Sequence, residues 1–191
     1  MAKPIATVGG ALARRKVVEE LLAYSALAVA IGPVRALNAN PRTTTRRKWD
    51  PRSNWIPMEI ATGEVLIVAA DVAGVPARAI LDSGSGASIV GQSLAVRLGA
   101  EHREQRTISG LSGKAPVRLV RDIDVTLGQD VRRLPFLVEA NLQTLSSAFG
   151  RTIDLVLGAD MMTGKCLTLD FAGRRFASAE TGTFAGGDDW T

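Results

Sequence analysis

From residue 64 to residue 177 the chain alternates short apolar runs with small or polar residues, a pattern typical of β-strands. Residues 64–72 and 75–81 are rich in Val, Ile and Ala, and Ala73-Gly74 between them supplies a turn, so together they predict a β-hairpin. Further extended segments are expected at 89–90, 117–119, 123–127, 134–138, 154–157, 166–171 and 174–177. Two short helices are predicted, one over 92–98 that stops at Gly99 and one that begins after Gly158, and residues 141–150 are expected to form a loop or a helical turn. The pattern predicts a single, mostly β domain.

The chain on either side of this domain has a different composition. Residues 1–39 contain a basic cluster, the short apolar stretch 21–31 and a Gly-Pro break, which are the parts of a secretory signal. The apolar stretch is shorter than the ~20 residues of a membrane-spanning helix, so no stable membrane span is expected. We expect export to the periplasm or the medium; the alternative is a cytoplasmic protein with an amphipathic N-terminal helix, which Glu19 and Glu20 favour. Residues 40–57 form a basic, Pro- and Thr-rich linker, residues 58–177 the domain, and residues 178–191 a flexible tail.

The net charge of +4 is unevenly distributed along the chain. Residues 1–53 carry ten Lys and Arg against three acidic residues, whereas residues 54–191 hold 13 basic and 16 acidic residues, which gives −3. Because aromatic residues make up 5% of the chain and do not alternate with basic ones, no nucleic-acid partner is expected. The single cysteine, Cys166, excludes a disulfide within the chain and a cysteine-based metal site. The single histidine, His102, lies among charged residues, which disfavours a Ser–His–Asp or Cys–His pairing. We expect neither a metal nor a cofactor.

One carboxylate lies in an unusual place. Asp82 ends the apolar run 79–81 and is followed by the small residues of the segment 83–88. Small residues let neighbouring backbone come close to the carboxylate. A carboxylate at the end of a buried strand is costly unless another group shares or neutralises its charge. The sequence therefore predicts a partner for Asp82, although a turn carboxylate that caps local amides is the simpler interpretation.

The sequence Asp82-Ser83-Gly84-Ser85, followed by Ser88-Ile89-Val90, resembles the active-site signature of the retropepsin-like (retroviral-type) aspartic proteases. Three further segments follow in the order of that family. The segment Ser109-Gly110-Leu111-Ser112-Gly113 resembles its glycine-rich flap, residues 155–158 its apolar segment under the active-site loop, and residues 167–170 its closing strand. The resemblance covers residues 64–177 and implies a closed, retropepsin-like β-barrel domain with one or two short helices.

The resemblance also implies a function. It implies an aspartic endopeptidase that acts as a homodimer on peptide or protein substrates, with Asp82 of each chain forming the catalytic dyad. Ser83 would connect the two active-site loops and Gly84 would allow close approach to the carboxylates, while residues 109–113 would fold over an extended substrate. The alternative is a retropepsin-like module that binds peptides or dimerises without catalysis.

Overall fold

A computed structural model of the chain describes residues 54–61, 65–99, 103–110 and 113–181. The predicted signal segment 1–39 and most of the predicted linker lie outside these residues. So do His102, Leu111, Ser112 and residues 182–191 of the predicted tail. No helix within the described residues is long and apolar enough to cross a membrane.

Ten strands and three short helices make up the described domain. The strands are β1 (Ile56–Ala61), β2 (Val65–Val72), β3 (Val75–Leu81), β4 (Ile89–Gly91), β5 (Arg103–Gly110), β6 (Gly113–Leu127), β7 (Asp130–Ala140), β8 (Leu155–Leu157), β9 (Lys165–Asp170) and β10 (Arg175–Glu180). The helices are α2 (Gln92–Arg97), α3 (Gln143–Phe149) and α4 (Ala159–Met162). The mostly β fold class is confirmed, with one helix more than the two predicted.

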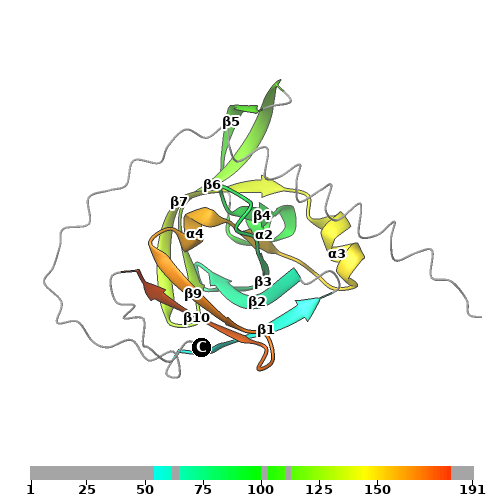
Figure 1. Cartoon of the computed structure of the whole chain (residues 1–191). Coiled ribbons are helices and arrows are strands. Elements are labelled where there is room, and N and C mark those ends of the chain that lie inside the picture. Colours follow the sequence, from blue (N-terminus) through cyan, green and yellow to red (C-terminus); the bar gives the residue numbers. More distant parts are fainter. Residues whose placement is uncertain (1–53, 62–64, 100–102, 111–112, 182–191) are drawn as a thin grey trace, which may run out of the picture.

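All ten strands belong to one sheet, in the order β5-β6-β7-β4-β8-β3-β2-β1-β10-β9. An additional pairing of β6 with β2 closes part of this sheet into a ring of six strands. Most neighbours are antiparallel, but β3 runs parallel to β8 and β4 runs parallel to β7. The closed architecture predicted from the resemblance thus takes the form of this ring, with β1, β9 and β10 beside it (Figure 1).

The strands at the centre of the sheet are buried on both faces. In β8, Leu155 and Leu157 pack into one apolar cluster and Val156 into the other. In β4, Val90 belongs to the first cluster and Ile89 to the second. Removing one such side chain from water contributes about 2 kcal/mol. The central strands therefore form a rigid support for the loops that follow them.

Four details differ from the sequence-based expectation. Strand β6 is continuous, although the polar pair at 121–122 reads as a break between two strands; Asp122 instead adopts φ +51 within the strand, a conformation that Asp tolerates better than most residues. Residues 143–149 form a helix that ends at Gly150 with φ +63. Strand β10 pairs with β9 as far as Glu180, so residues 178–180 are not part of a flexible tail. Ile56 and Pro57 belong to β1, where they pair with β10, and are therefore not part of the linker.

Candidate active site

Asp82 lies directly after β3, at the point where this strand leaves its parallel neighbour β8. The pairing of β3 with β8 ends at Leu81 and Leu157, and the Asp82 N–H then donates to the Leu157 carbonyl oxygen at 2.9 Å. The side chain of Asp82 is half-buried, while Ser83 and Gly84 are exposed. The structure therefore places the three predicted catalytic residues together, at the open end of a buried strand.

Short local hydrogen bonds fix the loop of residues 82–88, which we call the Asp82 loop. The Gly84 N–H donates to Asp82 Oδ1 at 2.9 Å, and the Ser85 N–H donates to the Asp82 carbonyl oxygen at 3.2 Å. Ser85 is fully buried, and its hydroxyl donates to the Ala87 carbonyl oxygen at 2.7 Å. Within the described part of the chain Asp82 has no ion pair. Its carboxylate is held in place by an amide, but its charge is not neutralised.

Gly158, directly after β8, lies against the Asp82 loop with almost no space between the two backbones. A Cβ atom on Gly158 would come within 2.7 Å of the Ser85 carbonyl oxygen and of the Ala87 carbonyl carbon. The next residue, Ala159, donates its N–H to the same Ser85 oxygen at 2.7 Å. Residues 155–158 therefore support the Asp82 loop directly, in the position that the resemblance implies for them, and the contact requires glycine for lack of space.

Asp160 also supports this loop, and the sequence analysis missed it. The Ser88 N–H donates to Asp160 Oδ2 at 2.8 Å and the Ser88 hydroxyl to Oδ1 at 2.7 Å, while the same hydroxyl accepts the Gly158 N–H at 3.0 Å. Ser88 is fully buried. The available signal was an acidic residue in the first turn of a helix that follows an apolar strand and a glycine, because such a residue accepts free amides. That signal does not identify the distant partner, Ser88.

The predicted flap residues lie in a separate hairpin formed by β5 and β6. Ser109 pairs with Lys114 and Gly110 with Gly113, whereas Leu111 and Ser112 at the tip lie outside the described residues. The hairpin projects beyond the ring of strands (Figure 1). The predicted catalytic residues and the predicted flap residues therefore belong to different elements, the Asp82 loop and the β5–β6 hairpin.

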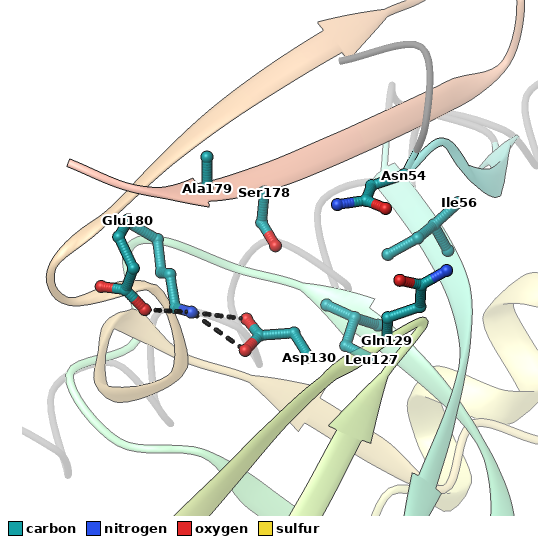
Figure 2. Close-up of a pocket in the computed structure, with 9 residues that line it drawn as sticks. Asn54, Ile56, Leu127, Gln129, Asp130, Ser178, Ala179 and Glu180 are labelled. Atoms are coloured by element: carbon teal, nitrogen blue, oxygen red, sulfur yellow. Dashed lines mark hydrogen bonds and ion pairs between the residues drawn. The ribbon is translucent and has the colours of Figure 1, made fainter. Parts of the chain in front are cut away.

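A second charged group lies in a hollow of about 300 Å³ between the β6–β7 turn and the strands β1, β9 and β10 (Figure 2). There Lys165 Nζ contacts Asp130 Oδ2 at 2.9 Å and Glu180 Oε1 at 2.6 Å. Burial alone would lower the pKa of Lys165, but its hydrogen bonds to Glu180 and Asp130 outweigh burial and raise the pKa above the ordinary value. The hollow contains no predicted site residue. Within the described residues, no group of three or more His, Cys, Asp or Glu side chains could hold a metal ion.

Comparison with known proteins gives one result that bears on this site. A family model described as aspartyl protease matches residues 68–161. The match runs from β2 to α4, so it contains the Asp82 loop, the projecting hairpin and Gly158. A search of curated proteins yields no match. The chain belongs, through this domain, to the aspartyl protease family of the retropepsin-like type.

Proposed function

We propose that the protein is an aspartic endopeptidase whose active site forms when two copies bring their Asp82 carboxylates together. One observation carries the proposal: a half-buried carboxylate at the end of a buried strand, fixed by the Gly84 amide and without an ion pair in the described part of the chain. An unneutralised carboxylate in such a position is typical of a functional group. Membership of the aspartyl protease family gives this carboxylate a role in peptide hydrolysis.

The chemistry requires two carboxylates. Two carboxyl groups ~3 Å apart cannot both ionise, so the pair holds one proton, as is known for aspartic proteases. The ionised carboxylate accepts a proton from water while the water oxygen bonds to the peptide carbonyl carbon, and the protonated carboxyl donates to the carbonyl oxygen. The C–N bond then breaks as the carboxyl that took the water proton passes it to the nitrogen, while the other carboxylate takes a hydroxyl proton from the intermediate as the new carboxyl group forms. Because each domain supplies one Asp82 loop, a symmetric homodimer provides the pair.

Three other predicted residues or segments receive roles in this proposal. Ser83 is exposed beside Asp82, where its hydroxyl reaches the second copy. Gly84 lets the partner's backbone approach while its N–H orients the Asp82 carboxylate. The hairpin that contains Ser109, Gly110 and Gly113 closes over an extended peptide, which binds through backbone hydrogen bonds.

A peptide-library digest tests the catalytic role of Asp82. Wild type is compared with Asp82→Asn, which keeps the size of the side chain but cannot act as a base. We expect cleavage to fall by about 10³-fold or more with little change in thermal stability. Asp122→Asn is the matched control, because Asp122 is exposed with φ +51, a conformation that Asn also adopts readily. Cleavage by Asp82→Asn at the wild-type rate would remove the catalytic assignment.

The dimer is tested separately by dilution. If the dyad spans two chains, activity per mole of chain falls as the concentration drops below the dimer dissociation constant. Sedimentation at the same concentrations should show the dimer disappear in parallel. Full activity from a monomer would refute the shared dyad, and a stable dimer that binds peptides without cleaving them would favour the non-catalytic module instead.

A further inference from the structure

The root of the β5–β6 hairpin contains a buried carboxylate that the proposed chemistry does not use. The side chain of Glu139, on β7, is 1% exposed. Arg103 on β5 donates from Nε and Nη2 to its two oxygens, at 2.9 and 2.8 Å. Arg118 on β6 places its Nε 3.2 Å from Oε1. A bidentate contact of this kind fixes the orientation of the guanidinium as well as its distance from the carboxylate.

This cluster lies where the hairpin loses the support of the sheet. The pairing of β6 with β7 ends at Arg118 and Glu139, whereas the pairing of β5 with β6 continues to Gly110 and Gly113. Beyond the cluster the hairpin therefore consists of two strands alone, as its projection in Figure 1 shows. An isolated two-stranded hairpin is at best marginally stable in water. Its direction depends on how its root is held.

The same strand, β7, is bonded to the segment that follows Asp82. Glu139 pairs with Val90 of β4, and the N–H of the preceding residue, Val138, donates to the Ser88 carbonyl oxygen at 3.0 Å. Ser88 is the last residue of the Asp82 loop. Glu139 thus joins both hairpin strands to the strand that directly contacts this loop.

Alternation along the strands separates the ion cluster from the apolar packing. Val117, Leu119 and Val138 belong to the apolar cluster that also contains Ile89 and Ala87. Arg118 lies between Val117 and Leu119, and Glu139 directly follows Val138, so both side chains point to the opposite face of the sheet. Apolar packing holds one face of the hairpin root, and the carboxylate with its two arginines holds the other.

We infer that Glu139 is a positioning residue, which fixes the direction of the β5–β6 hairpin relative to the Asp82 loop by binding Arg103 and Arg118 at its root. Without the carboxylate, two guanidinium groups face each other across the root, and the hairpin samples other directions. The effect on cleavage rests on the proposed function, because it assumes that the hairpin must lie over a peptide bound at Asp82. When only a fraction of molecules has the hairpin in place, the apparent affinity for the peptide is the intrinsic affinity multiplied by that fraction.

Hydrogen exchange and steady-state kinetics test this inference together. The variants are Glu139→Gln, which removes the negative charge of the carboxylate, and Arg103→Lys. The second is a milder change, which keeps the positive charge but loses the bidentate contact. Glu104→Gln is the matched control, because Glu104 also contacts two arginines of this hairpin, Arg106 and Arg121, but is 40% exposed.

In Glu139→Gln we expect the amides of residues 113–117, except Pro116, which has no N–H, to exchange about tenfold faster, while those of β8 stay at the wild-type rate. The KM for a peptide that reaches under the hairpin should rise about tenfold with little change in kcat. Arg103→Lys should show both effects more weakly, and Glu104→Gln should show neither.

Unchanged exchange at residues 113–117 in folded Glu139→Gln, or in Arg103→Lys where Glu139→Gln does not fold, would overturn the inference. An equal increase in the Glu104→Gln control would also overturn it, since any lost ion pair would then suffice. Faster hairpin exchange in a protein whose wild type cleaves nothing would support the inference and count against the proposed protease activity.

Discussion

The Asp82 loop and the hollow around Lys165 each contain a charged group, but the neighbours of the two groups differ. Lys165 is enclosed by two carboxylates, Asp130 and Glu180, which raise its pKa despite its burial. Asp82 is held by the Gly84 amide and, in the described part of the chain, has no cation beside it. Both groups are partly removed from water, yet only the lysine has its charge compensated by neighbouring side chains.

The difference separates a structural charge from a candidate catalytic one. A compensated ion pair ties strands together and gains little from a further partner. An uncompensated carboxylate on a rigid loop retains the capacity to bind a proton, a water molecule or a second carboxylate. Substitutions in the Asp82 loop should therefore lower cleavage by more than the accompanying loss of folded protein explains. Substitutions in the hollow should lower the free energy of unfolding but not the rate of cleavage.

Gly158→Ala should give the largest effect on the loop. Its Cβ would collide with the backbone of Ser85 and Ala87 at 2.7 Å, and backbone cannot move aside as a flexible side chain can. We expect a loss of about 2–3 kcal/mol in the free energy of unfolding and a loss of about 10²-fold in cleavage, because the Asp82 loop is displaced. Denaturant unfolding and peptide cleavage measure the two effects.

Gly164→Ala is the matched control for that variant. Gly164 has φ +78 but nothing within 4 Å of the added methyl group, so the substitution strains its own backbone without touching the loop. A stability loss of about 1 kcal/mol with normal cleavage is expected. Equal losses of cleavage in the two variants would show that the loop has no special sensitivity.

Ser88→Ala should have the next largest effect. It removes the hydroxyl that donates to Asp160 and accepts from the Gly158 amide. The buried Gly158 N–H then loses its acceptor, whereas Asp160 keeps the N–H groups of residues 88 and 161. The expected cost is about 2 kcal/mol, with cleavage about tenfold lower. Ser93→Ala on the exposed face of α2 should change stability by less than about 0.5 kcal/mol. If Ser88→Ala behaved like Ser93→Ala, the hydroxyl would not support the loop.

Lys165→Met tests the other side of the comparison. It removes the cation and leaves Asp130 and Glu180 close together. The free energy of unfolding should fall by about 1–2 kcal/mol, while the rate of cleavage per folded molecule stays at the wild-type value. Reduced turnover in fully folded Lys165→Met would mean that the hollow communicates with the active site, against the distinction drawn above.

The dependence of stability on pH should show the smallest effect. The pKa of Lys165 is raised in the folded state above its ordinary value of 10.5, so its contribution is complete below that pH and is lost as the pH rises through the folded pKa. Urea unfolding followed from pH 9 upwards should show wild type losing, above pH 10.5, stability that Lys165→Met does not lose. Parallel curves for the two proteins would indicate that the ion pair contributes nothing measurable.

The features with local signals could be predicted from the sequence. The β2–β3 hairpin follows from two apolar runs around Ala73-Gly74, and the end of α2 follows from Gly99. The position of Asp82 follows from the apolar run before it. These elements depend on residues that are neighbours in the chain, so a pattern of ten residues contains the information.

The features that were missed depend on distant partners. Asp160 supports the loop only because Ser88, 72 residues earlier, lies beside it. Glu139 reads as an ordinary polar position at the end of a strand, and its burial depends on Arg103, 36 residues away, and on Arg118. The sequence did not predict that β6 is continuous, because polar residues at 121–122 are typical of a break. In the structure Asp122 takes a left-handed conformation, and the pairing with β7 continues on both sides of it. Composition near these residues does not reveal such contacts.

The parallel pairing of β3 with β8 has a consequence for the order of folding. The contact between Arg78 and Asp154 spans 76 residues, and the support of the Asp82 loop by Gly158 spans nearly as many. Closing a loop of this length early is entropically unfavourable, and long-range strand pairing is slow. A nascent chain that has left the ribosome as far as β7 already contains Asp82, but not the strand that shapes its loop. The geometry of the Asp82 loop is therefore among the last features of the domain to form, although the loop itself is synthesised early.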